Sequence, residues 1–247
     1  MIQTYNESAL IHDCVQNARD VGDSVIVVDT GSTDDTVSRA RAAHATVLSH
    51  PFVRYVEPAR SFGVTHADGD WVFLLDADEY IPPELAAEIR TVIEAHVHNS
   101  YRVPRKELFG RKVWLRHGGW WPNHQIRLIR KEAFRDWPPA IHSTPIIEGS
   151  EGVLENPLLH FSKNDYARIV EKTTIFEDTE AELLAKAGRK ATVPVFFRKF
   201  FGELYRRLIR DHGYLDGKIG VIESIYQAFS KTITYLYVYE KTTGRTV

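Results

Sequence analysis

"SVIVVDTGSTDDT" (residues 24–36) joins a short run of β-branched residues to a glycine-containing turn and the start of a helix. A continuous apolar run of this length, bounded by turn residues, is typical of a buried strand. We expect Ser32 to cap the following helix, with Asp35 three residues further on as in a capping box. The stretch therefore predicts a strand–helix unit whose strand ends at Asp29.

The same alternation continues on both sides of this unit. The predicted strands lie near residues 1–5, 24–30, 44–50 and 71–79, and the predicted helices near residues 6–20, from 32, 57–67 and 84–98. Pro82 and Pro83 open the last of these helices, because proline suits a first helical turn and ends a strand. Strands that alternate with helices predict an α/β fold with a mostly parallel sheet covered on both faces.

Acidic residues follow one of the predicted strands directly. In "VFLLDADEYIPP" (72–83) an apolar run leads into Asp76, Asp78 and Glu79. Ligands of open parallel sheets bind at the carboxyl ends of the strands, so we expect Asp29 and Asp76 to face one crevice. Two carboxylates on alternate residues suit Mg²⁺ or Mn²⁺, with a nucleotide diphosphate completing the metal shell. The alternative is an acidic turn that only faces solvent.

The bulk properties exclude several classes of protein. A formal net charge of −2 argues against a general nucleic-acid-binding protein. A single cysteine, Cys14, cannot form an internal disulfide, and no basic-then-apolar segment opens the sequence. No stretch reaches the roughly 18 apolar residues of a membrane-spanning helix. We therefore expect a cytoplasmic protein.

The pattern changes twice along the chain. From about residue 100 it consists of strand-like pieces rich in arginine and aromatic residues, and after residue 164 it is helical to the end. We predict a catalytic domain over residues 1–163, with halves at 1–98 and 99–163, followed by a helical extension over 164–247.

An ordered set of motifs resembles the family 2 glycosyltransferases, and more narrowly the bacterial lipopolysaccharide-core glucosyltransferases. The motifs are "TYNE" (4–7), "VIVVDTGSTDDT" (25–36), "ARSFG" (59–63), "GDWVFLLDADE" (69–79), "WWPNHQIRLIRK" (120–131) and "PLLHFS" (157–162). The resemblance implies the GT-A fold and an inverting, metal-dependent transfer of a hexose. Glucose from UDP-glucose is the favoured donor, and the implied acceptor is a lipid-linked saccharide of the cell envelope.

The resemblance also assigns residues to the nucleotide-sugar site: Thr4, Tyr5, Glu7, Asp29, Arg60 and Asp76. Thr4 and Tyr5 would border a uracil base and Asp29 would accept its N–H, while Arg60 would lie near the diphosphate. Asp76 would hold the ribose or a metal-bound water.

The resemblance makes Asp78 the principal ligand of Mg²⁺ or Mn²⁺, with Asp76 beside it. His160, in "LLHFS", would be a third ligand or an acceptor contact, and the alternative is a buried structural histidine. The metal would offset the charge that grows on the departing diphosphate.

The general base is the point at which this chain departs from the resemblance. The related enzymes have a His-Glu pair after the "WWP…QxRL" stretch, whereas this chain reads "AIHST" (140–144) with Ser143 in place of the glutamate. A serine cannot act as the base unaided. His142 is the first candidate and Asp136 and Glu148 are the others, while a core histidine is an equally good interpretation of His142.

Trp120, Trp121 and Gln125 are candidates for acceptor binding, because flat indole faces stack on pyranose rings. Core packing is the alternative for both tryptophans. Further on, "VFFRKFFGELYRRLIR" (195–210) places bulky aromatics opposite arginines at helical spacing. Such a helix suits an anionic membrane surface, or packs on the catalytic domain. The segment 221–241 would dock on the domain or form an oligomer contact.

Two rival functions remain open from the sequence. The first is a catalytically impaired protein that keeps the GT-A fold as a binding or scaffold module, suggested by Ser143 and by a short first strand. The second is a phosphatase or phosphomutase with Asp76 as nucleophile. A complete strand–helix region precedes Asp76, and this argues against the second.

Overall fold

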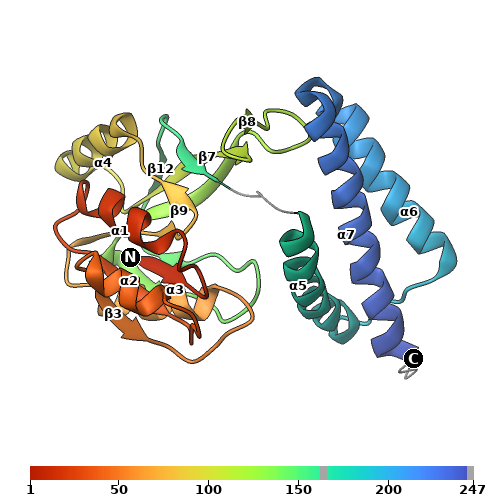
Figure 1. Cartoon of the computed structure of the whole chain (residues 1–247), viewed down its shortest axis with the longest axis horizontal. Helices are drawn as coiled ribbons and strands as arrows, with labels where there is room; N and C mark the ends of the chain where they lie inside the picture. Colours follow the sequence, from red (N-terminus) through yellow and green to blue (C-terminus); the bar gives the residue numbers. More distant parts are fainter. Residues whose placement is uncertain (162–165, 244–247) are drawn as a thin grey trace. The chain divides into compact units, whose positions relative to one another are not determined.

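The computed structural model describes residues 1–161 and 166–243 (Figure 1). Its contacts divide the chain into two units. The α/β unit comprises Met1–Lys106 and Asn123–Phe161, and the helical unit comprises Glu107–Pro122 and Ser162–Val247. The predicted boundary after residue 163 falls within 162–165, outside the described residues. The segment 107–122, expected in the catalytic domain, groups instead with the C-terminal helices.

The first sheet of the α/β unit is parallel, with strand order β3-β2-β1-β5. The strands are β1 (Ile2–Thr4), β2 (Ile26–Asp29), β3 (Thr46–Ser49) and β5 (Leu75–Asp76). The helices α1 (Ile11–Arg19), α2 (Thr36–Ala42), α3 (Glu57–His66) and α4 (Pro83–Ala95) alternate with them along the chain. The register pairs Thr4 with Asp29 and Gln3 with Asp76, so both aspartates lie at the carboxyl edge of this sheet.

We predicted one strand over residues 71–79, but the structure has three short strands over residues 71–80. β4 (Trp71–Phe73) pairs antiparallel with β9 (Asn123–Arg130), whereas β5 pairs parallel with β1. β6 (Glu79–Tyr80) then pairs with β13 (Leu158–His160). The segment thus passes from one sheet to the other, which its uniformly apolar sequence does not reveal. The acids Asp76 to Glu79 lie at this crossing.

The second sheet has the order β4-β9-β7-β13-β6. Its long strand β7 (Ser100–Phe109) pairs with β9, with β12 (Glu151–Val153) and with β8 (Val113–Trp114). A separate pair joins β10 (Phe134–Asp136), which follows the short 3₁₀ turn Lys131–Ala133, to β11 (Ile146–Ile147). Buried aliphatic residues such as Ile2, Val27 and Leu128 form the core of the unit.

The predicted cap at Ser32 is wrong. The helix α2 begins at Thr36 after Asp35, and the Ser32 hydroxyl accepts the backbone N–H of Asn6 instead. The backbone N–H of Ser32 donates to Asp29, which ties it to the preceding strand. The turn after β2 is therefore organised around an acid at the strand end.

The helical unit contains α5 (Tyr166–Lys186), α6 (Val193–Leu204) and α7 (Gly217–Thr243). A π-helical segment (Tyr205–Arg210) extends α6, and a 3₁₀ turn (Gly213–Asp216) precedes α7. The long helix α7 lies between α5 and α6 and packs against both (Figure 1). Among the described residues, no helix has the length and apolar character needed to span a bilayer.

Candidate functional site

Four side chains from three distant segments form an ion-pair cluster at the end of β5. Arg60 of α3 lies 2.7 Å from one carboxylate oxygen of Asp76, and Arg127 of β9 lies 2.8 Å from the other. The same Nη2 of Arg127 donates to Glu79 at 2.6 Å. Glu79 in turn accepts the backbone N–H of Asp76, which closes the turn between β5 and β6. The cluster fixes the backbone that carries the acidic motif.

The pKa values of the two carboxylates in this cluster, Asp76 and Glu79, are shifted in opposite directions. Burial opposes ionisation of Asp76, but the attraction of Arg127 and Arg60 outweighs it and holds the pKa of Asp76 well below its ordinary value. Burial raises the pKa of Glu79, with the neighbouring charge of Asp76 adding to this effect against the attraction of Arg127. The two carboxylates raise the pKa of Arg127 despite its burial. Asp76 is therefore a permanent anion that is already engaged by two cations.

Asp78 points to a different partner. Its Oδ2 lies 3.2 Å from Nε2 of His160 on β13, and the Asp78 backbone carbonyl accepts the N–H of Phe161. The side chain of Asp78 is 33% exposed and that of His160 is 14% exposed, so the pair is accessible. A carboxylate oxygen beside an imidazole nitrogen is a donor set that Mn²⁺ accepts, and Mg²⁺ often uses few protein ligands when phosphates complete its shell. These two residues therefore fit a divalent cation better than Asp76 does.

The described residues contain no cluster of three or more histidine, cysteine, aspartate or glutamate side chains arranged for a metal. The structure brings Asp78 and His160 within 3.2 Å of each other. It places Asp76 against arginines, where its oxygens are less available for coordination.

The carboxyl ends of β1 and β2 form the neighbouring part of the edge. The Asp29 carboxylate accepts the backbone N–H groups of Gly31 and Ser32, and Gly31 has a φ of 89° that favours glycine. Thr4 is buried, and its hydroxyl has no hydrogen-bond partner among the described residues. A buried unpaired hydroxyl is costly, so this position suits a polar group of a ligand. The Glu7 backbone N–H donates to the Thr36 hydroxyl, which links the segment after β1 to the start of α2.

Two exposed aromatic side chains lie at the same edge. The ring centroids of Tyr5 and Phe52 are 4.9 Å apart with the ring planes tilted by 57°, and these residues are 41% and 55% exposed. The Cβ of Phe52 lies close to Gly31, beside the turn that Asp29 holds. Sequence reasoning missed Phe52. The available signal was its place three residues after β3, on the edge where ligands of such sheets bind.

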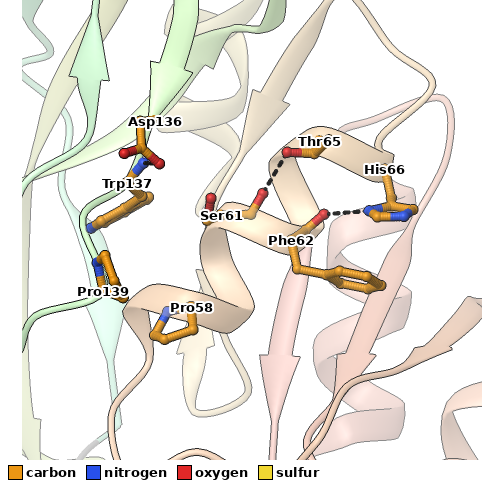
Figure 2. Close-up of a pocket in the computed structure, with 8 residues that line it drawn as sticks. All are labelled: Pro58, Ser61, Phe62, Thr65, His66, Asp136, Trp137 and Pro139. Carbon is orange, nitrogen blue, oxygen red and sulfur yellow. Dashed lines mark hydrogen bonds between the residues drawn. The ribbon is translucent and has the colours of Figure 1, made fainter.

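A cavity of about 410 Å³ lies between α3 and the segment that follows β10 (Figure 2). Asp136, Trp137 and Pro139 line one side, and residues of α3 such as Ser61 and His66 line the other. The guanidinium carbon of Arg60 lies 5.8 Å from the centre of the Trp137 ring. Trp137 thus links the wall of this cavity to the Asp76 cluster, while Asp136 itself lines the cavity.

His142 and Ser143 belong to a loop that is held from several directions. The His142 backbone N–H donates to the buried Glu57 at 2.8 Å, and His142 has a φ of 61°, which is uncommon for a residue other than glycine. The indole N–H of Trp137 donates to the Ser143 carbonyl, and the Ser143 hydroxyl donates to Pro138. The loop is therefore anchored through Trp137, the residue beneath Arg60.

Glu148 is paired on the surface with Arg135. The hydrogen bond from Arg135 lowers the pKa of the Glu148 carboxyl, and the same bond raises the pKa of the Arg135 guanidinium. A lowered pKa makes a carboxylate a weaker base, so this contact disfavours Glu148 as the group that removes a proton.

The three predicted acceptor-binding residues do not belong to one unit. Trp120 and Trp121 lie in the helical unit, whereas Gln125 lies on β9 of the α/β unit. Arg207 covers Trp120 at 5.0 Å from the ring centre, and Trp121 meets Trp114 edge to face at 5.4 Å. Both tryptophans are partly exposed and packed within their own unit.

Comparison with known proteins gives consistent matches. Residues 1–147 match the family described as "Glycosyl transferase family 2". An uncharacterised glycosyltransferase of Rickettsia prowazekii is 28% identical over 93% of this chain and 82% of its own length. One from Rickettsia typhi is 29% identical over 93% of this chain and 82% of its own length.

Two solved structures are similar to this chain at low sequence identity. The S. aureus TarS structure of residues 1–349 has a TM-score of 0.47 and 13% identity, covering 99% of this chain and 90% of that one. Glucosyl-3-phosphoglycerate synthase of Mycobacterium tuberculosis, solved with Mn²⁺, UDP and glucosyl-3-phosphoglycerate, has a TM-score of 0.46 and 19% identity, covering 76% and 78%. By the family match over more than half of its length, this chain belongs to glycosyl transferase family 2 and is an α/β enzyme of the GT-A type.

Proposed function

We propose that this glycosyltransferase transfers a hexose from a UDP-sugar to a lipid-linked saccharide acceptor of the cell envelope. The transfer inverts the configuration at the anomeric carbon. Glucose is the hexose we favour, on the sequence resemblance to lipopolysaccharide-core enzymes. The observation that carries the proposal is the placement of Asp78 with His160 beside the Asp76–Arg60–Arg127 cluster, at the carboxyl edge of a parallel sheet.

The base of the donor would bind at the other half of this edge. Tyr5 and Phe52 offer exposed aromatic faces, and the unpaired Thr4 hydroxyl and the Asp29 carboxylate offer polar groups next to them. Glu7 would hold the turn beside the base, since its backbone N–H donates to the Thr36 hydroxyl. Aromatic stacking with adjacent polar contacts is a common way to hold a nucleobase.

Asp78 and His160 would hold Mg²⁺ or Mn²⁺, which supplies positive charge to the departing diphosphate. Asp76 would position Arg60, whose guanidinium faces the phosphates as a second source of positive charge. Arg127, which is almost fully buried, would keep Asp76 ionised and in place.

The acceptor hydroxyl attacks the anomeric carbon, the sugar–phosphate bond breaks, and the hydroxyl proton passes to a base of the protein. His142, Asp136 and Glu148 were the candidates. We favour His142, because its loop is tied through Trp137 to Arg60, whereas Glu148 is paired with Arg135 and the Asp136 carboxylate accepts the backbone N–H of Trp137. Gln125 on β9 would contact the acceptor, and Trp120 and Trp121 are separate candidates for acceptor binding within the helical unit.

The test measures UDP release from a panel of UDP-sugars with Mn²⁺, Mg²⁺ or a chelator, beside calorimetric binding of UDP. We expect metal-dependent release from one donor, and binding of UDP that Asp78→Asn weakens at least tenfold with Mn²⁺ present. Asp68→Asn, in an exposed turn of the same unit, is the matched control and should bind as the wild type does.

Two results would redirect the proposal. UDP binding without release from any donor, with oligosaccharide acceptors supplied, would favour the catalytically impaired binding protein. Unchanged affinity of the Asp78→Asn protein for UDP with Mn²⁺ would refute the metal site.

A further inference from the structure

The helix α7 exposes a straight row of apolar side chains. The row consists of Ile222, Ile225, Phe229, Leu236 and Tyr239, which are 40–49% exposed, with the partly exposed Thr232 in phase between them. The spacing is three, four, three, four and three residues, which is the alternation of core positions in a coiled coil. We call this row the α7 seam. Its average step of 3.5 residues keeps it on one side of the helix, drifting by only about 20° per heptad.

The other sides of α7 are already occupied within the helical unit. Towards α5, the hydroxyls of Ser230 and Thr234 donate to the buried Glu177. Towards α6, the ammonium group of Lys199 lies 4.9 Å from the centre of the Tyr235 ring. The seam is therefore the side of α7 that neither neighbouring helix covers, in agreement with the position of α7 between α5 and α6 (Figure 1).

The seam carries no charge. Between Lys218 and Glu240 the charged residues of α7 are Glu223 and Lys231; Glu223 is buried and Lys231 pairs with Glu180 of α5. Helices that bind an anionic membrane surface usually present free cations beside their apolar face. This helix lacks such cations along the seam, which favours a protein surface as the partner.

Part of the basic charge of the preceding segment is paired within the unit. Arg206 and Arg207 both pair with Glu203, and Arg210 pairs with Asp211. Arg206 and Arg210, together with Arg198 and Lys199, are the cations that favour contact with an anionic leaflet. The internal ion pairs of Arg206 and Arg210 reduce the charge available for it.

A second exposed row on α6 has a different geometry. Val193, Phe197, Phe201, Tyr205 and Ile209 recur every four residues. Within α6 a step of four residues turns by about 40° each time, so Val193, Phe197 and Phe201 shift around the helix axis, and Tyr205 and Ile209 follow in the π-helical segment. The row does not form a straight seam for a partner helix.

We propose that α7 pairs with α7 of a second copy of this chain through the α7 seam. Two identical heptad rows are self-complementary, as a twofold interface requires. Five large side chains that each keep about 100 Å² exposed offer about 500 Å² per copy, against about 800 Å² per partner in a standard interface. The flanks of the helices must supply the rest, so the expected dissociation constant is on the order of micromolar. The proposal does not depend on the transferase activity.

The test is sedimentation equilibrium of the full chain from about 1 to about 100 µM. The wild type is expected to be dimeric at the upper end. Phe229→Glu and Ile225→Glu each place a charge in the seam and should raise the dissociation constant at least tenfold. Circular dichroism melting checks that both variants remain folded, and the second variant serves if the first does not fold. Ile146→Glu, at an exposed apolar position of the α/β unit, is the control and should remain dimeric.

A monomeric wild type at the highest concentration would overturn the proposal, as would two folded seam variants that still dimerise. Flotation with vesicles containing phosphatidylglycerol distinguishes the alternatives in that case. If the monomeric wild type floats with the vesicles and the Phe229→Glu protein does not, the seam binds a lipid surface. A monomer that does not float excludes both a second copy and a lipid surface as the partner of the seam.

Discussion

At the scale of single residues, the acidic motif separates into parts with different tasks. Asp76 and Glu79 are held by Arg127, and only Asp78 faces an accessible imidazole. The three acids look equivalent in the sequence. The difference comes from which side chains approach them from other segments, above all an arginine 51 residues away from Asp76.

Arg127→Met should be strongly destabilising, by about 3–5 kcal/mol at neutral pH, because it removes the cation that Asp76 and the buried Glu79 share and leaves only Arg60 on Asp76 and Arg105, at 3.6 Å, on Glu79. Arg130→Met removes the exposed ion pair with Glu132 and should cost less than about 1 kcal/mol. Urea unfolding of both variants measures the contrast. Equal losses for the two would contradict the role given to Arg127.

The cost of Arg127→Met should also depend on pH. In the wild type the lowered pKa of Asp76 contributes stability that is present above the unfolded pKa and is lost as the pH falls through the folded pKa. The raised pKa of Glu79 acts in the opposite sense, so its contribution is lost as the pH rises through its folded pKa. Without Arg127 both groups accept protons more readily, so the loss of stability should shrink as the pH is lowered from about 7 to about 4.5. A loss independent of pH would argue for packing as its cause.

Phe52→Ala tests the aromatic edge beside Tyr5. Loss of a stacking face costs about 1–3 kcal/mol per base, so UDP affinity should fall by roughly tenfold or more. Binding of pyrophosphate with Mn²⁺ should change little, since that ligand has no base. Tyr214→Ala, at an exposed tyrosine of the helical unit, is the matched control for calorimetry. An equal loss of pyrophosphate affinity would show that Phe52 acts on the fold of the edge.

At the scale of elements, the helix α3 joins three parts of the site. Its first residue, Glu57, holds the His142 loop, Arg60 reaches Asp76, and the side formed by Ser61 and His66 lines the cavity (Figure 2). These positions lie on different faces of a short helix. A shift of α3 would therefore disturb the loop and the acidic cluster together.

Glu57→Ala should loosen the loop without unfolding the α/β unit. Removing the acceptor of the His142 N–H costs about 1–3 kcal/mol, and amide exchange over residues 140–144 should accelerate. Under the proposed role of His142, UDP release should fall while UDP affinity stays near that of the wild type. Glu84→Ala, an exposed acid in the first turn of α4, is the control in hydrogen-exchange measurements. Unchanged exchange in the loop would contradict this anchor.

At the scale of the whole molecule, the chain leaves the α/β unit at residue 106, joins the helical unit over 107–122 and then returns. Asp216 holds the segment 107–122 in the helical unit. Its carboxylate accepts the backbone N–H groups of Arg116 and His117 and lies 2.6 Å from Nδ1 of His117. The segment 107–122 contains Trp120 and Trp121. The helical unit thus holds residues that we propose for acceptor binding.

Asp216→Ala should release residues 113–118 from the helices, because three hydrogen bonds to one carboxylate are lost. We expect faster amide exchange there, unchanged UDP binding, and slower transfer to a saccharide acceptor. Asp178→Ala removes the ion pair with Lys241 in the same unit and is the control for exchange over 113–118. Unchanged exchange in this segment would show that other contacts hold it.

The sequence by itself determined the alternating strands and helices, the positions of Asp29 and Asp76 at strand ends, and the family. Local periodicity and turn residues encode these features, so they can be recognised without distant contacts. Only the tertiary structure decided that the run before Asp76 divides between two sheets, that Asp76 meets arginines while Asp78 meets His160, and that Trp120 belongs with the helices. Each depends on pairing between segments far apart in the chain, which the local pattern of apolar and polar residues does not specify.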